Sequence, residues 1–206
     1  MDGKIAQATQ RYYYHHAYRR QQRLWFGYPI SKYSDDLMAY QNIIHKTRPE
    51  VLVETGTYYG ASALYFAQLF DAIGRGQVIT IDIYPQAKRP SHPRIAYVRG
   101  SSLDDEIFAG IKRAVASGRC MVVLDSNHHY PHVLAELEKY HTLVTSECYL
   151  VVEDTFLNGH PVRKEWGPGP WEAVEKWLPG HPEFERPAAL NGRLLTMNPG
   201  GWLRRT

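Results

Sequence analysis

The stretch Val53-Glu54-Thr55-Gly56-Thr57-Tyr58-Tyr59-Gly60-Ala61-Ser62 joins a short apolar run to an amphipathic segment. Gly56 lets the backbone turn sharply and lets a ligand approach closely, and Gly60 stands where the free N–H groups of a helix start favour a negative group. The turn lacks the three closely spaced glycines of a dinucleotide site, and the Glu54 carboxylate repels a pyrophosphate and favours a cationic ligand. We therefore expect a strand, a tight ligand-binding turn and a helix.

Apolar runs and amphipathic segments alternate on both sides of this turn. The runs are nearly continuous, which is typical of strands covered on both faces, and the alternation predicts a parallel sheet with helices on both sides. The expected fold class is α/β, a Rossmann-like, doubly wound, mostly parallel sheet. The expected strands are Val51–Thr55, Val78–Asp82, Ile95–Val98, Met121–Asp125 and Tyr149–Glu153, and the helices between them are Ala61–Phe70, Asp104–Ala116 and His132–Tyr140.

Helical segments precede the sheet. Residues Ile5–Leu24 form a polar, tyrosine-rich helical pattern, and Leu37–Lys46 forms a second helix that Ser34 or Asp35 can cap. We interpret residues 1–48 as an N-terminal helical extension or lid on the sheet.

The pattern changes after Glu153. We expect a helix at Trp171–Leu178 and closing strands at Arg193–Met197 and Gly201–Leu203. No linker divides the chain, and 206 residues suit one domain with a substantial core. Residues 1-206 are therefore predicted to form a single domain.

The charge of the chain does not indicate a nucleic-acid partner. The net charge is only +3. Arg19, Arg20 and Arg23 lie among tyrosines, a mixture that can stack on RNA. An amphipathic helix packed on the domain or on a second subunit is the favoured interpretation, and we expect a homo-oligomer.

The two cysteines and the absence of long apolar runs indicate the cellular compartment of the protein. No segment approaches 18 uninterrupted apolar residues, so no membrane span is expected. The N-terminus has no basic stretch followed by an apolar run, so no signal peptide is expected. Cys120 and Cys148 each begin an expected buried strand without CxxC spacing, which predicts reduced thiols. We expect a cytoplasmic protein without a membrane partner.

The ends of the strands hold the candidate cofactor residues, because ligands bind past the carboxyl ends of the strands in such a sheet. Asp82 ends the second strand, where an acid can bind both ribose hydroxyls. Ser102 follows the third strand and can meet an adenine edge, or Ser101 or Ser102 can cap the helix near Asp104. With Glu54, these residues indicate an adenosine-containing cation such as S-adenosylmethionine (SAM), which carries an ammonium and a sulfonium.

Three acids follow the fourth and fifth strands. Asp125 ends one, and Glu153 and Asp154 end the other. If the strands are neighbours, the carboxylates converge and repel one another unless they are protonated or bind a cation. Oxygen ligands suit Mg²⁺, and His128 or His129 beside them can take a proton from a metal-bound hydroxyl.

Two other interpretations of these residues stay open. Asp125 can cap a helix while Glu153 and Asp154 lie on a solvated loop. A zinc site from His128, His129 and His132 is a further option, although neighbouring histidines point in different directions.

Five segments of the chain carry a family resemblance: VETGTYYGAS (53–62), ITIDI (79–83), GSSLD (100–104), VVLDSNHHYPHVLAEL (122–137) and YLVVEDT (149–155). They resemble the cephalosporin hydroxylase family, which also covers rhamnosyl and macrolide-sugar O-methyltransferases, and their order resembles catechol O-methyltransferase and its metal-dependent relatives. The resemblance runs from about Trp25 to Arg204. It implies the class I fold of SAM-dependent methyltransferases, with SAM and Mg²⁺ or another divalent cation as cofactors.

The resemblance also implies roles for individual residues. His128 matches the position of the catalytic base, which is a lysine in the catechol-type enzymes, and His129 is the substitute. The segment Lys164–Pro170 matches a loop near the substrate, and Leu103 stands where those enzymes have a polar adenine contact. The expected metal ligands are Asp125, Glu153 and Asp154. The expected cofactor contacts are Glu54, Gly56, Thr57, Tyr58, Gly60, Ser62, Asp82, Ser102 and Asp125.

The predicted function is SAM-dependent, metal-dependent O-methylation of a small-molecule hydroxyl, on a sugar or a natural-product intermediate. A hydroxylase or oxidoreductase is one alternative, but a non-haem iron site uses two histidines and one carboxylate, whereas this cluster has three carboxylates. A non-catalytic SAM-binding partner protein is the other alternative.

Overall fold

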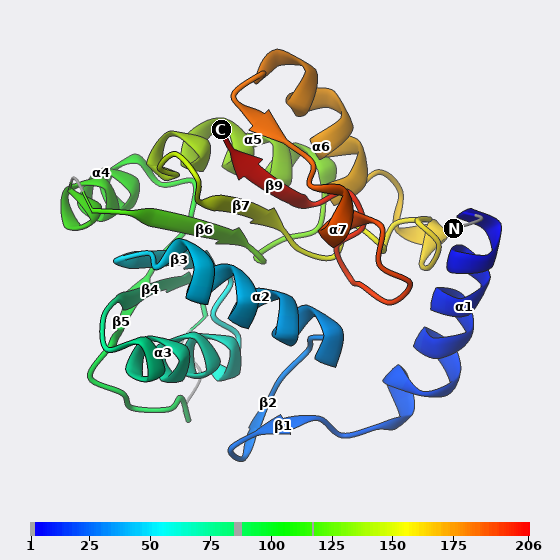
Figure 1. The fold of residues 1–206 in the computed structure, drawn as a ribbon, viewed down its shortest axis with the longest axis horizontal. Helices are drawn as coiled ribbons and strands as arrows, with labels where there is room; N and C mark the ends of the chain where they lie inside the picture. The colour runs from blue at the N-terminus through cyan, green and yellow to red at the C-terminus, as the bar shows by residue number, and fades with distance from the viewer. Residues whose placement is uncertain (1–2, 85–87, 117) are drawn as a thin grey trace.

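The computed structural model describes residues 3–84, 88–116 and 118–206, and it contains the predicted α/β sheet (Figure 1). Two short antiparallel strands extend one edge of five parallel ones, in the order β5-β4-β3-β6-β7-β9-β8. The order reverses between β3 and β6, so the switch point lies at the ends of these two strands. The strands are β3 (Val51–Thr55), β4 (Gln77–Asp82), β5 (Ile95–Arg99), β6 (Cys120–Leu124), β7 (Tyr149–Val152), β8 (Phe184–Glu185) and β9 (Trp202–Arg205).

Helices cover both faces of the sheet. Helices α4 (Asp105–Val115), α5 (Tyr130–Tyr140) and α6 (Pro170–Trp177) pack on one face, and α2 (Ser34–Thr47) and α3 (Ala61–Ile73) pack on the other.

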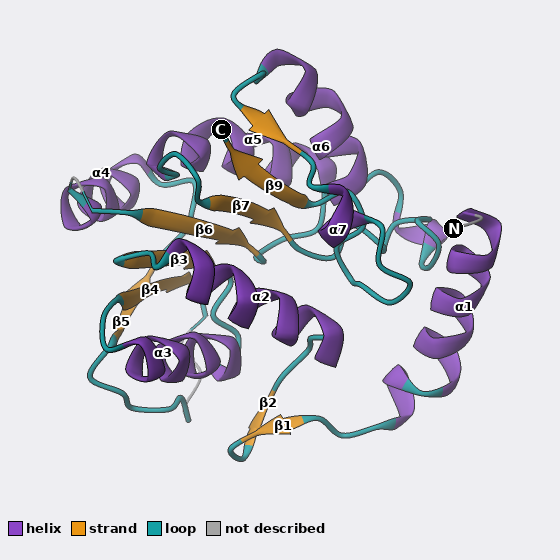
Figure 2. Cartoon of the chain, in the orientation of Figure 1, coloured by secondary structure: helices purple, strands orange, loops and turns teal. Residues whose placement is uncertain are grey.

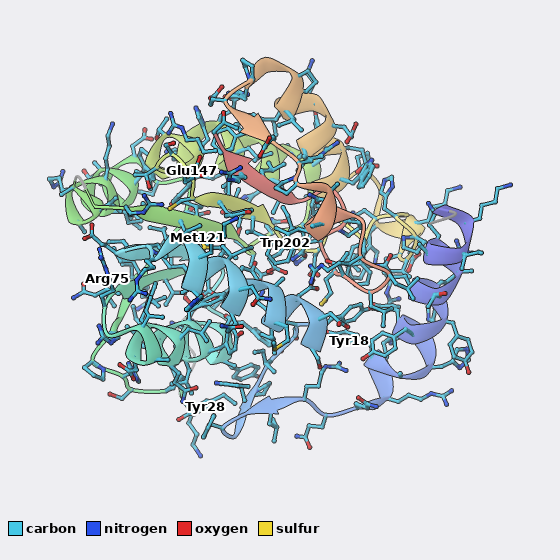
Figure 3. The ribbon with its side chains drawn as sticks, in the orientation of Figure 1. Tyr18, Tyr28, Arg75, Met121, Glu147 and Trp202 are labelled. Carbon is cyan, nitrogen blue, oxygen red and sulfur yellow. The ribbon has the colours of Figure 1, made fainter. Side chains whose placement is uncertain are left out.

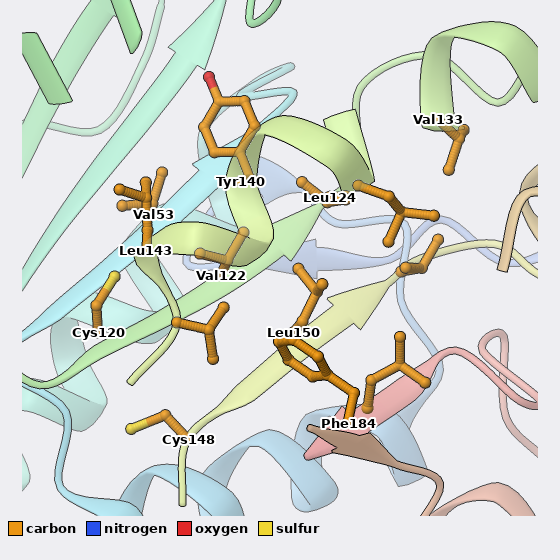
Figure 4. Close-up of a cluster of buried hydrophobic side chains, with 14 of the residues drawn as sticks. Val53, Cys120, Val122, Leu124, Val133, Tyr140, Leu143, Cys148, Leu150 and Phe184 are labelled. Carbon is orange, nitrogen blue, oxygen red and sulfur yellow. The ribbon is translucent and has the colours of Figure 1, made fainter. Parts of the chain in front are cut away.

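The central strands are buried on both sides. Val122 and Leu150 belong to the core under α4, α5 and α6 (Figure 4). Met121 and Trp202, which are labelled in Figure 3, belong to the core under α2 and α3. This double burial explains why the strands are continuous apolar runs and confirms the predicted fold class.

The N-terminal segment is less helical than expected. Helix α1 (Gly3–His16) is followed by a 3-10 turn at Tyr18–Arg20 and by a hairpin of β1 (Leu24–Trp25) and β2 (Tyr28–Pro29) (Figure 2). The predicted helix to Leu24 is wrong at its end, because Arg23 stacks over the Tyr18 ring with 3.4 Å between guanidinium carbon and ring centroid and donates to the Tyr18 carbonyl. This contact of Arg23 lies within the N-terminal segment itself.

The predicted closing strand at Arg193–Met197 is also wrong. Helix α7 (Ala188–Asn191) precedes it, and β8 takes the place beside β9. The reason is the fully buried carboxylate of Asp36, which accepts hydrogen bonds from the Met197 N–H and the Thr196 hydroxyl, each at 2.7 Å. The segment is therefore held against the start of α2 instead of pairing with β9.

Two helix caps differ from the expected ones. The residue before α2 is Tyr33, which makes no side-chain cap, so neither Ser34 nor Asp35 caps this helix. Helix α4 is capped by Asp104, whose carboxylate accepts from the backbone N–H groups of Glu106 and Ile107. Ser102 is thus free of the capping role. No helix within the described ranges is long and apolar enough to cross a membrane.

Candidate active site at the carboxyl edge of the sheet

The turn after β3 presents a buried carboxylate. Glu54 is fully buried, and the Thr80 hydroxyl on the neighbouring strand donates to its Oε2 at 2.6 Å. Its other oxygen, Oε1, has no hydrogen-bond partner among the described residues. Burial raises the pKa of Glu54 to about 7, while the hydroxyls of Ser62 and Thr80 and the ammonium of Lys32 oppose this shift. A buried acceptor without a donor is costly and is suited to a cationic ligand.

Gly56 is required by packing as well as by the turn. Its φ is +86°, and a Cβ there would lie 1.9 Å from the carbonyl oxygen of Asp125. The turn after β3 and the end of β6 therefore touch backbone to backbone. Gly60 ends the turn with a φ of +77° and precedes α3 as expected.

Asp82 is held at the end of β4. Its carboxylate accepts from the backbone N–H groups of Tyr58 at 2.7 Å and Tyr84 at 2.8 Å, and Arg89 lies 3.4 Å away. These donors fix the orientation of the carboxylate at the wall of a cavity along this edge.

Two adjoining cavities bring most of the predicted cofactor residues together. The larger, of about 1060 Å³, reaches Gly56, Tyr58, Asp82, Ser102 and Asp125. The smaller, of about 270 Å³, adds Thr57 and Ser62. Glu54 and Gly60 lie behind the walls instead of lining either cavity.

The ends of β6 and β7 bring Asp125, Glu153 and Asp154 to one place. The strands are parallel neighbours, with Leu124 paired to Val152, so the acids follow at the same level. Glu153 is 2 % exposed, and its Oε1 accepts from the Tyr40 hydroxyl on α2. The Oδ1 of Asp154 is buried without a partner in the described chain.

A lysine that sequence reasoning missed lies in the middle of these acids. The Nζ of Lys32 is 3.0 Å from Asp125 Oδ2 and 2.9 Å from Glu153 Oε1, and its side chain is only 2 % exposed. Lys32 comes from the segment between β2 and α2. Nothing near Lys32 in the sequence resembles a site motif, so only the fold could reveal this contact.

Burial and mutual repulsion dominate the titration of this cluster. Burial raises the pKa of Asp125 to about 6, with Lys32 lowering it and Glu153 raising it further. The pKa of Asp154 lies well above its usual range because of burial and because of the nearby Asp125 and Glu153. Burial by itself lowers the pKa of Lys32, but the two carboxylates it contacts hold it well above its usual value. The ammonium is therefore charged.

The two candidate bases are separated. The Nε2 of His128 lies 3.1 Å from Asp154 Oδ2, and burial lowers the pKa of His128 to about 4. His128 is thus neutral near pH 7 and lies at the acid cluster. His129 is exposed on the wall of the larger cavity and is the residue before α5. The structure brings only His128 to the acids.

The zinc alternative is wrong. Among the described residues, the group with metal-ligand spacing at this edge is Asp125, His128 and Asp154, with one potential ligand atom from each within 4.8 Å of the others. His132 is not part of this group, and its Nε2 contacts the Ser126 hydroxyl at 3.1 Å.

A second buried acid escaped the sequence reasoning. Glu136 on α5 is 1 % exposed and accepts from the Ser126 hydroxyl at 2.8 Å. His132, four residues earlier, also reaches Ser102, with 3.4 Å from Nε2 to the hydroxyl oxygen. The signal in the sequence was the i, i+4 pair of His132 and Glu136 on one helix face. These residues connect the ends of β5 and β6 along the larger cavity.

The chain is similar to known proteins over most of its length. The family model Rhamnosyl O-methyltransferase/CmcI matches residues 17–206. The chain belongs to this family. It is 36% identical over 191 residues to a rhamnosyl O-methyltransferase of Mycobacterium tuberculosis (strain H37Rv), covering 88% of this chain and 77% of the relative. A rhamnosyl O-methyltransferase of Mycobacterium leprae is 36% identical over 169 residues, covering 78% of this chain and 74% of the relative.

Solved structures of methyltransferases share the fold. A structure of CmcI with Mg and SAM has a TM-score of 0.69 at 18% identity, covering 89% of this chain and 76% of that chain. The MycE methyltransferase of mycinamycin biosynthesis, in complex with Mg, SAH and mycinamycin VI, has a TM-score of 0.53 at 21% identity, covering 66% of this chain and 38% of that chain. At these identities the likeness establishes the class I methyltransferase fold.

Proposed function

We propose that this protein is a SAM-dependent O-methyltransferase that uses a divalent cation such as Mg²⁺ and methylates a hydroxyl of a small molecule, on a sugar or a natural-product intermediate. The observation that carries the proposal is the convergence of Asp125, Glu153 and Asp154 at the edge of the sheet, beside a cavity lined by Asp82, Ser102 and Asp125. The mycobacterial relatives named rhamnosyl O-methyltransferases support a sugar hydroxyl as the acceptor.

The residues at the acid cluster fit a hard divalent cation. All three acids offer oxygen atoms, and Asp154 Oδ1 is buried without a donor. Asp125, Glu153 and Asp154 are the residues that would hold the ion. Among the described residues Asp125 and Asp154 already have metal-ligand spacing, whereas Glu153 contacts Lys32 and Tyr40. When bound, a divalent cation would lower the pKa of a coordinated hydroxyl and neutralise the carboxylates.

The residues at the end of β3 and β4 fit a cationic adenosyl ligand. Glu54 Oε1 is a buried acceptor without a donor, and Asp82 is oriented by two backbone N–H groups at the cavity wall. Glu54 would bind the ammonium end of SAM and Asp82 its ribose hydroxyls. Ser102, which lines the same cavity, would lie at the adenine.

His128 is the residue that can move the proton. It is neutral near pH 7, and its Nε2 lies at the acid cluster. It would accept the hydroxyl proton of the acceptor as the oxygen attacks the methyl group. The remaining work of the chain is alignment of that oxygen with the sulfonium methyl, which contributes much of the rate in such transfers.

The hydroxylase alternative has less support. A non-haem iron site uses two histidines and one carboxylate, whereas the described group with metal-ligand spacing has one histidine and two carboxylates.

We also propose a cytoplasmic homo-oligomer. Cys120 and Cys148 are buried and free, which fits a reducing compartment. Tyr12 on α1 and Phe26 in the β1–β2 turn are exposed aromatic residues that a second subunit could cover.

The testing experiment combines SAM titration with a methyl-transfer assay. Calorimetric titration of SAM should give micromolar binding, and rhamnosylated acceptors should gain one methyl group by mass spectrometry in the presence of Mg²⁺. The Asp125→Ala variant should bind SAM but not transfer the methyl group. Transfer by this variant in the presence of EDTA would disprove the metal role, and failure of the wild type to bind SAM would disprove the proposal as a whole.

A further inference from the structure

Lys32 is the buried cation of the candidate metal site, and neither the family resemblance nor the comparisons assign it a role. Its ammonium contacts Asp125 and Glu153 at 3.0 and 2.9 Å. It also lies 5.8 Å from the centre of the Tyr40 ring, whose hydroxyl donates to Glu153. Three groups thus enclose the ammonium at the point where the carboxylates converge.

The charges of the cluster explain why a cation is needed there. Asp125, Glu153 and Asp154 carry three negative charges when ionised, and Lys32 reduces the sum to −2. Buried carboxylates without a counter-charge are strongly unfavourable. Lys32 therefore makes the acid cluster compatible with the folded chain when no divalent ion is bound.

The same contacts oppose the binding of a metal. A divalent ion within reach of Asp125 and Glu153 comes close to the ammonium, and like charges at such a separation repel strongly in a buried site. The ion must either displace Lys32 from one carboxylate or share both carboxylates with it. Either arrangement weakens metal binding relative to a cluster with a neutral residue at this position.

We propose that Lys32 is a built-in counter-ion that sets the metal affinity of the acid cluster, stabilising the metal-free protein and lowering its affinity for a divalent cation. This inference rests on the proposed metal site.

The placement of Lys32 extends its effect to the cofactor cavity. Ile30, Ser31 and Lys32 line the smaller cavity together with Tyr58 and Ser62. The ion pairs of Lys32 connect this wall to the residues that follow β6 and β7. A metal that displaces the ammonium would loosen the wall, and one that leaves it in place would not.

The test measures metal affinity without catalysis. Mn²⁺ is titrated into the full-length protein, and free Mn²⁺ is followed by electron paramagnetic resonance for wild type, Lys32→Met and Lys32→Arg. Lys139→Met is the control, because the ammonium of Lys139 pairs with the exposed Asp105 and not with an acid of the cluster. Thermal unfolding of each variant is recorded with and without Mg²⁺.

We expect Lys32→Met to bind Mn²⁺ at least about tenfold more tightly than wild type, because it removes a like charge beside the ion. Its melting temperature without metal should fall, and the rise on adding Mg²⁺ should exceed that of wild type. Lys32→Arg, which keeps the charge, and Lys139→Met should stay within about threefold of wild type. If Lys32→Met does not fold, Lys32→Gln takes its place, since its amide can still donate to Glu153.

Unchanged or weaker Mn²⁺ binding in the neutral variants would overturn the role of Lys32 and leave the proposed function standing. Absence of Mn²⁺ binding in wild type and in all variants would overturn both, because the acid cluster would then hold no metal.

Discussion

Glu54 accepts a hydrogen bond from the Thr80 hydroxyl through one carboxylate oxygen and leaves the other oxygen buried without a partner. The neighbouring strand therefore orients the carboxylate and leaves one buried acceptor oxygen available for a ligand. Hydrogen bonds to charged groups contribute about 1.5–3 kcal/mol. Glu54→Gln should weaken SAM binding roughly 10- to 100-fold by calorimetry, whereas Glu106→Gln, an exposed acid on α4, should not change it.

Glu54 should also make SAM binding depend on pH. Because burial raises the pKa of Glu54 to about 7, part of the free protein carries a protonated Glu54 at pH 6 to 7. A cationic ligand favours the ionised form, so binding should release a proton in this range, and the Kd should rise as the pH falls below about 7. Titration at pH 6 and pH 7 in two buffers of different ionisation enthalpy measures the released proton. A Kd that does not vary with pH, or equal variation in Glu54→Gln, would exclude Glu54 as the titrating group.

His128 and His129 should differ sharply in their contribution to the rate. General-base catalysis contributes roughly 10²- to 10⁴-fold, and only His128 reaches the acid cluster. His128→Ala should lower kcat by about 10² or more while the Kd for SAM stays near that of wild type. His129→Ala should retain most of the activity. The opposite ranking of the two variants would move the base to His129.

The sequence was most informative where both faces of an element are buried. The strand Val51–Thr55 was predicted with its observed bounds, because double burial selects a continuous apolar run. The convergence of Asp125, Glu153 and Asp154 was expected on the condition that the two strands are neighbours, since the carboxyl ends of neighbouring parallel strands meet. Lys32 could not be predicted in this way. It lies 93 residues from Asp125 in a connecting segment, and a single lysine there carries no pattern.

The prediction of a closing strand at Arg193–Met197 was wrong for a related reason. The segment Arg193–Met197 was expected as a closing strand, but the pairing is decided by the buried Asp36 on α2, whose carboxylate accepts from the Thr196 hydroxyl and the Met197 N–H. A long-range polar contact of this kind overrides the local preference for a strand, and the residues around Arg193–Met197 do not predict it.

Asp36 should consequently be important for stability. Its carboxylate accepts from the Thr196 hydroxyl, the Met197 N–H and Arg193 Nη2, each at 2.7 Å. Asn at this position retains one acceptor oxygen and turns an N–H₂ group towards a donor. The Asp36→Asn variant should lose roughly 2–4 kcal/mol of the free energy of unfolding in urea. Asp35→Asn, a neighbouring exposed acid, is the matched control and should lose less than about 0.5 kcal/mol. Equal midpoints for the two variants would contradict the role of Asp36.

Gly56 provides the most direct test of how the active-site edge is built. Two separate costs meet at this residue: a positive φ of +86°, and a Cβ position 1.9 Å from the Asp125 carbonyl oxygen. Gly74 has a similar φ of +75°, but a Cβ there meets no atom within 4 Å. Gly74→Ala should therefore lose only the backbone cost of about 1–2 kcal/mol. Gly56→Ala must in addition push the end of β6 away from β3, so it should lose more than about 3 kcal/mol or fail to fold. Urea unfolding of the pair gives the difference directly. If the two variants are equally stable, the turn after β3 and the end of β6 are not in backbone contact, and the arrangement of Glu54 beside the acid cluster would have to be revised.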